Sequence, residues 1–209
     1  MNGAASFDSE LQKNLADLEA GNLRRHLREL QSAQTVRVQV GGCELLNFSS
    51  NDYLGLATHP VVVNTGIEAA KKWGWGSGAS RLISGNQSSH RELETRLAAF
   101  KKTEAALAFA SGSAAALGGL PALAGKGDVI ILDKLAHACL VDGARLSGAK
   151  LRIFPHNDME KLEQLLHWAA REYPQGKKWI VTESVFSMDG DRCDLQGVIE
   201  LKKRYGAML

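Results

Sequence analysis

Three short segments of the sequence carry groups that could act together in a binding site. Residues 111–113, Ser-Gly-Ser, form a turn of small residues, whose backbone N–H groups can bind a phosphate. His137 supplies an imidazole, and Glu183 supplies a carboxylate four residues before the hydroxyl of Ser187. Each also has an ordinary explanation, because His137 can cap a helix and Glu183 can be a buried, hydrogen-bonded carboxylate. Their importance depends on whether the fold brings them together.

The turn at residues 111–113 lies in an uncharged stretch that runs from Ala105 to Gly125. Its start, AALAFA, predicts a short buried strand, and an Ala/Leu-rich helix follows the turn until Gly118-Gly119 and Pro121. A strand that leads through small residues into a helix directs unpaired N–H groups and the positive end of the helix dipole toward one point, which suits a phosphate. A membrane span is disfavoured because the stretch consists mostly of Ala, Gly and Ser. An ordinary strand-turn-helix without a ligand is the remaining alternative.

Short apolar runs alternate with helical patterns after this stretch. We expect strands over residues 128–133, 150–154 and 178–183, and helices over 138–146, 158–170 and 195–205. The alternation predicts an α/β fold with a mostly parallel sheet and helices on both faces. Ligands of such sheets bind at the carboxyl ends of the strands. Because His137, Glu183 and Ser187 follow strand ends, we expect them to share one edge with the turn at residues 111–113.

The segment before Ala105 predicts an amphipathic arm, a hairpin and two helices. Apolar residues recur at helical spacing over residues 6–31, with a break at Gly21-Asn22. Two alternating runs flank Gly41-Gly42, whose glycines accept the positive φ angles of a tight hairpin turn. Helices are expected over residues 59–73 and 90–100. The glycine- and serine-rich segment 74–81 predicts either a connecting loop or a loop whose backbone approaches a ligand.

The arm carries three arginines, Arg24, Arg25 and Arg28. They form either a solvated face or a cationic site for a carboxylate or a phosphate.

Composition limits the class of protein. The chain has 209 residues, of which 44% are hydrophobic and 23% charged, so it is long enough to bury a sizeable core. A net charge of +2 does not favour binding to nucleic acid or to a membrane surface. The three cysteines have no metal-ligand spacing, and the N-terminus lacks the apolar core of a signal peptide. We expect a cytoplasmic protein with reduced thiols and without a metal site.

Three segments of the chain resemble the motifs of a known enzyme family. They are NFSSNDYLGL at residues 47–56, DKLAHACLV at 133–141 and TESVFSMDGD at 182–191. They resemble the α-oxoamine synthases, which are pyridoxal-phosphate (PLP) enzymes of the aspartate aminotransferase fold, or fold type I. The similarity runs from about Leu23 to the last residue. It implies an arm and hairpin over residues 1–50 and a truncated PLP-binding large domain over residues 51–209, with the rest of that domain and a C-terminal domain absent.

The resemblance also implies roles for individual residues. Gly112 and Ser113 are expected at the cofactor phosphate, and His137 is expected to stack on the pyridine ring near the substrate. Ser187 is expected to bond the phenolic oxygen of the cofactor, with Glu183 in a supporting catalytic role. Arg24 is similar to an arginine that binds the carboxylate of the acyl substrate. The family works as homodimers with shared sites, so residues 77–80 are expected to reach the neighbouring subunit.

The family implies a decarboxylative condensation of an amino acid with an acyl thioester. The motifs are most similar to the branch that joins L-alanine to pimeloyl-CoA, or to pimeloyl-carrier protein, and forms 8-amino-7-oxononanoate in biotin synthesis. Glycine C-acetyltransferase and 5-aminolevulinate synthase activities are the alternatives within the family. Outside it, the alternatives are a plain nucleotide-binding module, which lacks its expected glycine motif here, and a non-catalytic half-length binding paralogue.

Two departures from the family pattern affect these expectations. Ser113 replaces an aromatic residue and Ala116 replaces an asparagine, so any stacking or side-chain bond from these positions is lost. In the family, an Asp-x-x-His segment and the lysine that binds the cofactor come after the position of Leu209. We therefore expect the 209-residue chain alone to be inactive.

Overall fold

The computed structural model describes residues 3–209, and the side chains of residues 6–209. It divides into an N-terminal unit that ends at Gly78 and a C-terminal unit over Ala79–Leu209. Each unit is described by itself. Within the described residues, no helix is both long and apolar enough to cross a membrane. The predicted boundary near residue 50 stays a prediction.

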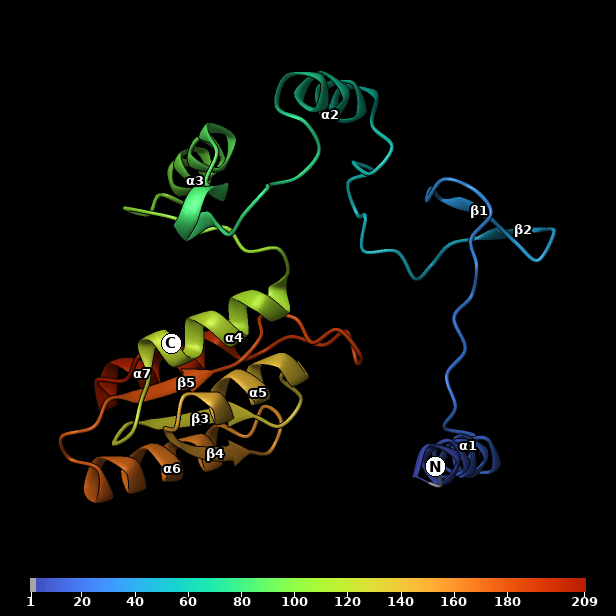
Figure 1. Ribbon diagram of the computed structural model, residues 1–209. Coiled ribbons are helices and arrows are strands. Elements are labelled where there is room, and N and C mark those ends of the chain that lie inside the picture. Colours follow the sequence, from blue (N-terminus) through green and yellow to red (C-terminus); the bar gives the residue numbers. More distant parts are fainter. Residues whose placement is uncertain (1–2) are drawn as a thin grey trace. The chain divides into compact units, whose positions relative to one another are not determined.

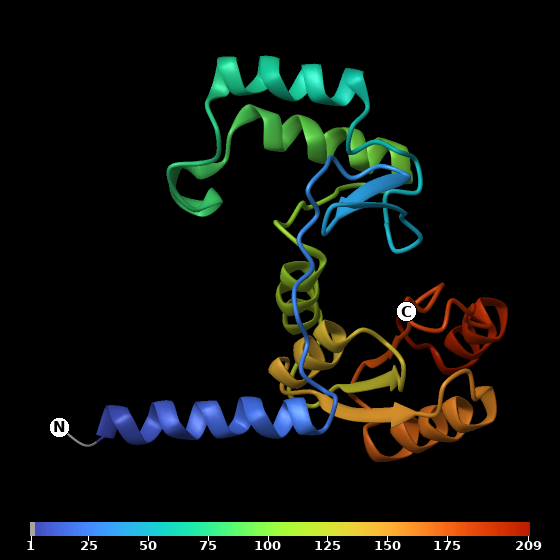
Figure 2. The same ribbon diagram turned by 90° about the vertical axis from the view of Figure 1, so that its right-hand side faces the viewer.

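The N-terminal unit begins with helix α1, Gly3–Ala20, which is shorter than the arm expected to residue 31. Asn22 adopts a positive φ of 53°, and the Leu23 N–H donates to the Leu18 carbonyl at 2.8 Å. The Asn22 N–H donates to the Glu19 carbonyl at 3.0 Å, which completes a Schellman cap. The expected break at residues 21–22 is therefore the end of the helix. An extended segment follows it (Figure 2).

The predicted hairpin is confirmed. Strands β1, Arg37–Val40, and β2, Cys43–Leu46, pair antiparallel with Val40 opposite Cys43. Gly41 and Gly42 have φ values of 57° and 80°, the positive angles that a two-residue hairpin turn requires.

The predicted helix at residues 59–73 is also confirmed, as α2, Pro60–Trp73. His59 caps its start by accepting a hydrogen bond from the Val61 N–H, and Pro60 occupies the first helical position, where a missing N–H costs nothing. Gly74 ends the helix with a φ of 79°.

The C-terminal unit contains the remaining elements. They are a π-helical turn η1, Arg81–Gly85, the helices α3, Ser88–Lys101, α4, Gly112–Leu123, α5, Ala138–Leu146, α6, Met159–Glu172, and α7, Leu195–Tyr205, and the strands β3, Val129–Asp133, β4, Lys150–Phe154, and β5, Lys178–Val181. The strands are parallel in the order β4-β3-β5. The main chain near Met208 also pairs in parallel with β5, since the Ile180 N–H donates to the Met208 carbonyl at 2.8 Å.

Helices cover both faces of this sheet, as predicted (Figure 1). On one face Ile131 of β3 packs with Leu162 and Leu166 of α6 and Val198 of α7. On the other face, Ile130 and Leu132 pack with side chains of α4 and α5. Every residue of β3 is buried, which explains its continuous apolar sequence. The central strand thereby fixes the edge at which its following residues emerge.

Two expectations for the uncharged stretch are wrong. Residues 105–110 form no strand, and no strand pairs with them in the part of the chain that the structure describes. Helix α4 continues past Gly118-Gly119 and includes Pro121. A Cβ at Gly118 would lie 3.0 Å from the Phe109 ring, so the glycine there accommodates a packed aromatic side chain and does not end the helix.

Candidate active site

The end of β3 is organised by Asp133, whose side chain is fully buried. Its Oδ1 accepts a hydrogen bond from the Leu135 N–H at 2.8 Å, which turns the chain toward α5. His137 follows as the N-cap of α5. The buried carboxylate therefore sets the position of the exposed imidazole through a turn of four residues.

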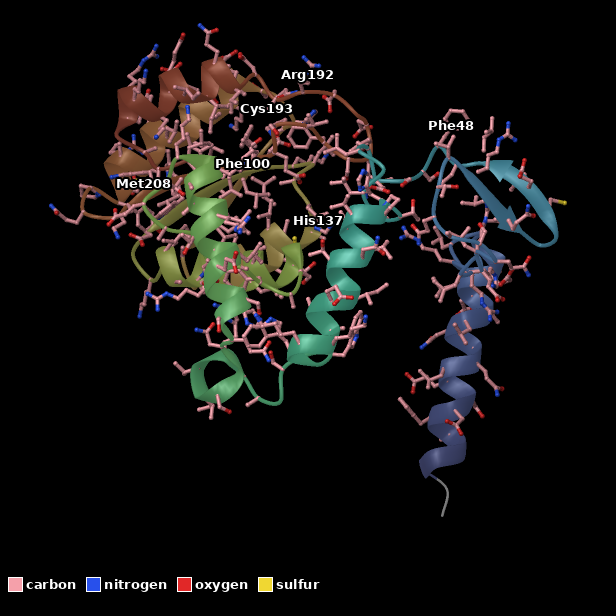
Figure 3. All side chains as sticks on the ribbon, turned by 90° about the horizontal axis from the view of Figure 1, so that it is seen from above. Phe48, Phe100, His137, Arg192, Cys193 and Met208 are labelled. Atoms are coloured by element: carbon pink, nitrogen blue, oxygen red, sulfur yellow. The ribbon has the colours of Figure 1, made fainter. Side chains whose placement is uncertain are left out.

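The His137 ring has a defined donor and acceptor arrangement. Its Nδ1 accepts a hydrogen bond from the Cys139 N–H at 3.2 Å and lies 2.9 Å from the Cys139 Sγ (Figure 3 labels His137 near the start of α5). A backbone N–H can only donate, so Nδ1 carries no proton when the ring is neutral. The neutral ring then carries its proton on Nε2. His137 can thus offer an N–H donor at that atom.

Glu183 joins the ends of β3 and β5. The His137 N–H donates to the Glu183 Oε1 at 2.5 Å, across 46 positions of the sequence. The predicted meeting of these two residues at one edge of the sheet is therefore present in the structure. The contact involves the backbone N–H of His137 and neither nitrogen of its ring.

The start of α4 has the geometry of an anion site. Ser111 adopts an extended conformation as N-cap, and its hydroxyl accepts the Ala114 N–H at 3.0 Å. The N–H groups of Gly112 and Ser113 precede the first intrahelical bonds, and no described residue accepts from them. Residues 111–113 are also exposed. They could bind a phosphate without displacing a protein group.

Ser187 lies in a tight loop after β5. The Phe186 N–H donates to the Asp191 carbonyl at 3.0 Å, and the Gly190 N–H donates to the Phe186 carbonyl at 2.8 Å. Val185 and Arg192 close the loop with an antiparallel bridge. Phe186 is buried, whereas Ser187 is exposed. The loop therefore anchors one side chain in the protein and presents the next one at its surface.

His156 is a further residue of this edge of the sheet, and no role was predicted for it from the sequence. Its Nδ1 lies 2.9 Å from the Asp133 Oδ1, and its Nε2 lies 2.6 Å from the Asp191 Oδ2. Hydrogen bonds to Asp191 and Asp133 raise the pKa of His156 above its ordinary value, although burial opposes the shift. Its place directly after β4 is the signal that could have identified it.

An ion pair between Arg81 and Glu94 holds the segment that precedes α4. The guanidinium of Arg81 donates to both oxygens of Glu94, at 2.7 and 2.9 Å, and its Nη1 also donates to the Ala108 carbonyl at 3.1 Å. The Arg81 bond lowers the pKa of Glu94 to about 2, with the Ala108 N–H as a further donor. This pair ties η1 and α3 to the backbone of Ala108, in the segment before α4.

Comparison with known proteins defines the family. Residues 44–209 match the family described as Aminotransferase class I and II. The chain belongs to this family. Among solved structures, the serine palmitoyltransferase of Sphingomonas wittichii has a TM-score of 0.86 at 32% identity and covers 100% of this chain and 52% of its own. The serine palmitoyltransferase of S. paucimobilis with a bound PLP-myriocin aldimine also has a TM-score of 0.86, at 30% identity. The match covers 100% of this chain and 52% of that enzyme. The fold and the resemblance to α-oxoamine synthases are thereby confirmed.

The curated relatives of this aminotransferase-family chain include several 8-amino-7-oxononanoate synthases. That of Geobacter sulfurreducens is 49% identical over 204 residues, which cover 98% of this chain and 50% of the relative. That of Pelobacter propionicus is 47% identical over 199 residues, with 95% and 50% covered. The chain therefore spans about half the length of the curated relatives it matches.

Arg24 belongs to the N-terminal unit, unlike the other predicted site residues. Its guanidinium lies 3.3 Å from the Glu19 carboxylate, and its side chain is 40% exposed. A single exposed ion pair of this kind is weak, so Arg24 can exchange it for another carboxylate. Its role toward the acyl substrate, like that of residues 77–80 at a subunit interface, stays a prediction.

Proposed function

We propose that this chain is the N-terminal part of a PLP-dependent acyltransferase that forms 8-amino-7-oxononanoate. The substrates are L-alanine and the pimeloyl thioester of CoA or of a carrier protein, and the products include carbon dioxide and the free thiol. The identity of 49% to the Geobacter sulfurreducens synthase over nearly the whole chain is the observation that carries the proposal. Because relatives are about twice as long, the activity is proposed for the intact protein.

The residues of the C-terminal unit suit PLP as a cofactor. The unpaired N–H groups of Gly112 and Ser113 at the start of α4 match the charge of its phosphate. The exposed hydroxyl of Ser187 can donate to its phenolic oxygen. When bound, PLP supplies an electron sink for the carbanion that the amino acid forms. Gly112 and Ser113 lie at a helix start, and Ser187 lies in a loop closed by backbone hydrogen bonds.

His137 is proposed as the catalytic residue of this half. Its ring would stack on the cofactor near the substrate, and its Nε2–H would be available as a hydrogen-bond donor. Glu183 accepts the hydrogen bond of the His137 N–H and thereby holds the backbone of His137 in place. Arg24 is proposed to bind the distal carboxylate of the pimeloyl chain. The homodimer expected for the family would complete the site with residues 77–80 of a second copy.

The lysine that binds the cofactor and the Asp-x-x-His segment are proposed to follow the position of Leu209. The first test is borohydride reduction of the intact protein with PLP, followed by peptide mapping. Trapping of the cofactor on a lysine beyond Leu209 supports the proposal. Absence of any trapped lysine in a folded, intact protein contradicts the catalytic role and favours a binding function.

Substrate comparison tests the choice within the family. The purified protein is assayed with L-alanine or glycine, each combined with pimeloyl-CoA, acetyl-CoA or succinyl-CoA. Turnover of L-alanine with pimeloyl-CoA is the expected result. A preference for glycine with acetyl-CoA or succinyl-CoA would assign the protein to glycine C-acetyltransferase or 5-aminolevulinate synthase activity instead.

A further inference from the structure

We propose that His156 is a positioning residue that ties the loop carrying Ser187 to the buried carboxylate of Asp133. His156 itself is not proposed to touch cofactor or substrate. The consequence for catalysis rests on the proposed function, because it acts through Ser187. The effect on the loop is a property of this chain alone and can be measured without cofactor.

Both ring nitrogens of His156 face carboxylate oxygens. The Nδ1 contact to Asp133 is 2.9 Å and the Nε2 contact to Asp191 is 2.6 Å. Ionised carboxylates only accept hydrogen bonds, so each ring nitrogen must donate one. The amide Nδ2 of Asn157 lies 3.2 Å from Nε2, but its two N–H groups have acceptors in the Arg192 carbonyl at 3.0 Å and the Asp191 Oδ2 at 3.4 Å. His156 is therefore an imidazolium that bridges two carboxylates.

The Asp133 side of this bridge is rigid. The carboxylate is fully buried and also accepts hydrogen bonds from the Leu135 N–H at 2.8 Å and the Asn157 N–H at 3.2 Å. Those donors belong to the turns that follow β3 and β4. Asp133 thus cannot move without breaking contacts of two strand ends.

The Asp191 side of the bridge is the loop itself. Asp191 accepts the Phe186 N–H through its carbonyl and His156 through its side chain. The Phe186 ring meets the imidazole edge-on, with ring centroids 4.4 Å apart and an angle of 84° between the planes. His156 therefore contacts both residues that close the turn of Ser187. Without it, the loop keeps its own backbone bonds and the hydrogen bonds from the Asn157 amide to the Arg192 carbonyl and the Asp191 carboxylate, but it loses its link to Asp133.

The bridge depends on pH through His156. The charged groups that act on it are Asp133 at the end of β3 and Asp191 in the loop, and both raise its pKa. A raised folded-state pKa means that the stabilisation is complete below about 6.5, the ordinary value. It is lost as the pH rises through the higher pKa of the folded protein. The loop is thus expected to loosen on the alkaline side.

The test is hydrogen–deuterium exchange in the intact protein without added PLP, followed by mass spectrometry. The variants are His156→Asn and, as a matched control, His167→Asn, which changes an exposed histidine of α6. We expect peptides spanning residues 184–193 to exchange on the order of tenfold faster in His156→Asn, as for loss of a hydrogen bond to a charged group. Peptides of β3 and α6 are expected to remain unchanged. After correction for the intrinsic pH dependence of amide exchange, the loop of the wild type and of the His167→Asn control should exchange faster as the pH rises. The loop of His156→Asn should not show this rise.

The proposal is overturned if the loop of His156→Asn exchanges at the wild-type rate. It is also overturned if β3 and α6 loosen as much as the loop, since this result indicates a general structural role. If His156→Asn does not fold, Asp191→Ala removes the acceptor on the loop side of the bridge, and an unchanged loop then overturns the proposal. Titration of PLP into the same samples separates the two hypotheses. A loosened loop in His156→Asn supports the role of His156, whether or not PLP binds. Failure of the wild type to bind PLP contradicts the proposed function.

Discussion

The backbone N–H of His137 donates to the carboxylate of Glu183 at 2.5 Å, and this one bond links the carboxyl ends of β3 and β5. It makes the position of the imidazole dependent on a residue that follows another strand. The proposed stacking of His137 on a cofactor requires such a fixed backbone, since small displacements of catalytic groups reduce rates strongly.

Replacement of Glu183 should therefore separate hydrogen bonding from charge. Glu183→Gln keeps an oxygen acceptor for the His137 N–H, and we expect kcat/KM of the intact enzyme to fall by only a few fold. Glu183→Ala leaves that N–H unpaired, and a loss of about 10- to 100-fold is expected, which corresponds to about 1–3 kcal/mol. The exposed Glu160 of α6 provides the control, as Glu160→Ala. Equal losses in the Gln and Ala variants would show that the charge of Glu183, and not its hydrogen bond, is required.

The tautomer of neutral His137 is a second prediction. Because the Cys139 N–H donates to Nδ1, we expect the neutral ring to carry its proton on Nε2. Nitrogen NMR of 15N-labelled histidine in the intact protein measures this directly. Cys139→Ala should leave the tautomer unchanged, since the backbone donor remains. A proton on Nδ1 in the wild type would contradict the assignment of His137 as an Nε2–H donor.

Two glycines give opposite predictions for stability. A Cβ at Gly143 of α5 would lie 2.5 Å from the Ala116 carbonyl oxygen of α4, so Gly143→Ala should destabilise the protein by about 1–3 kcal/mol. A Cβ at Gly119 of α4 meets no atom of the described residues within 4 Å. Gly119→Ala should therefore be neutral or stabilising by up to about 1 kcal/mol, because alanine favours helix. Denaturant unfolding of the intact protein measures both, and a tolerated Gly143→Ala would disprove the close packing of α4 on α5.

Acid unfolding should depend on Glu94. Its pKa is lowered to about 2 by Arg81, so its contribution to stability is present above its ordinary value of 4.5. That contribution is lost as the pH falls toward 2. Glu94→Gln should thus be less stable than the wild type at neutral pH, and the difference should shrink between pH 5 and pH 2. Glu92→Gln, which breaks an exposed pair with Arg96 on the same helix, is the control and should show little pH-dependent difference.

The sequence alone predicted the regular elements well. Helices α5 and α7 and strand β4 have the bounds that apolar periodicity predicted, and the glycine pair at residues 41–42 predicted the hairpin turn. These features depend on neighbours in the sequence, which is why they are visible in it. Alternation of strands and helices also predicted the parallel sheet, and thereby the meeting of His137 and Glu183 at one edge.

Tertiary structure decided what depends on distant partners. Residues 105–110 have the composition of a strand, but a strand exists only where another one pairs with it. Gly118 lies inside α4, where the absence of a side chain leaves room for the ring of Phe109. His156 gains its charge and its two anchors from Asp133 and Asp191, which are 23 and 35 positions away in the sequence. Local patterns determine which elements form, whereas hydrogen bonds and packing between them depend on three-dimensional proximity, which no single segment encodes.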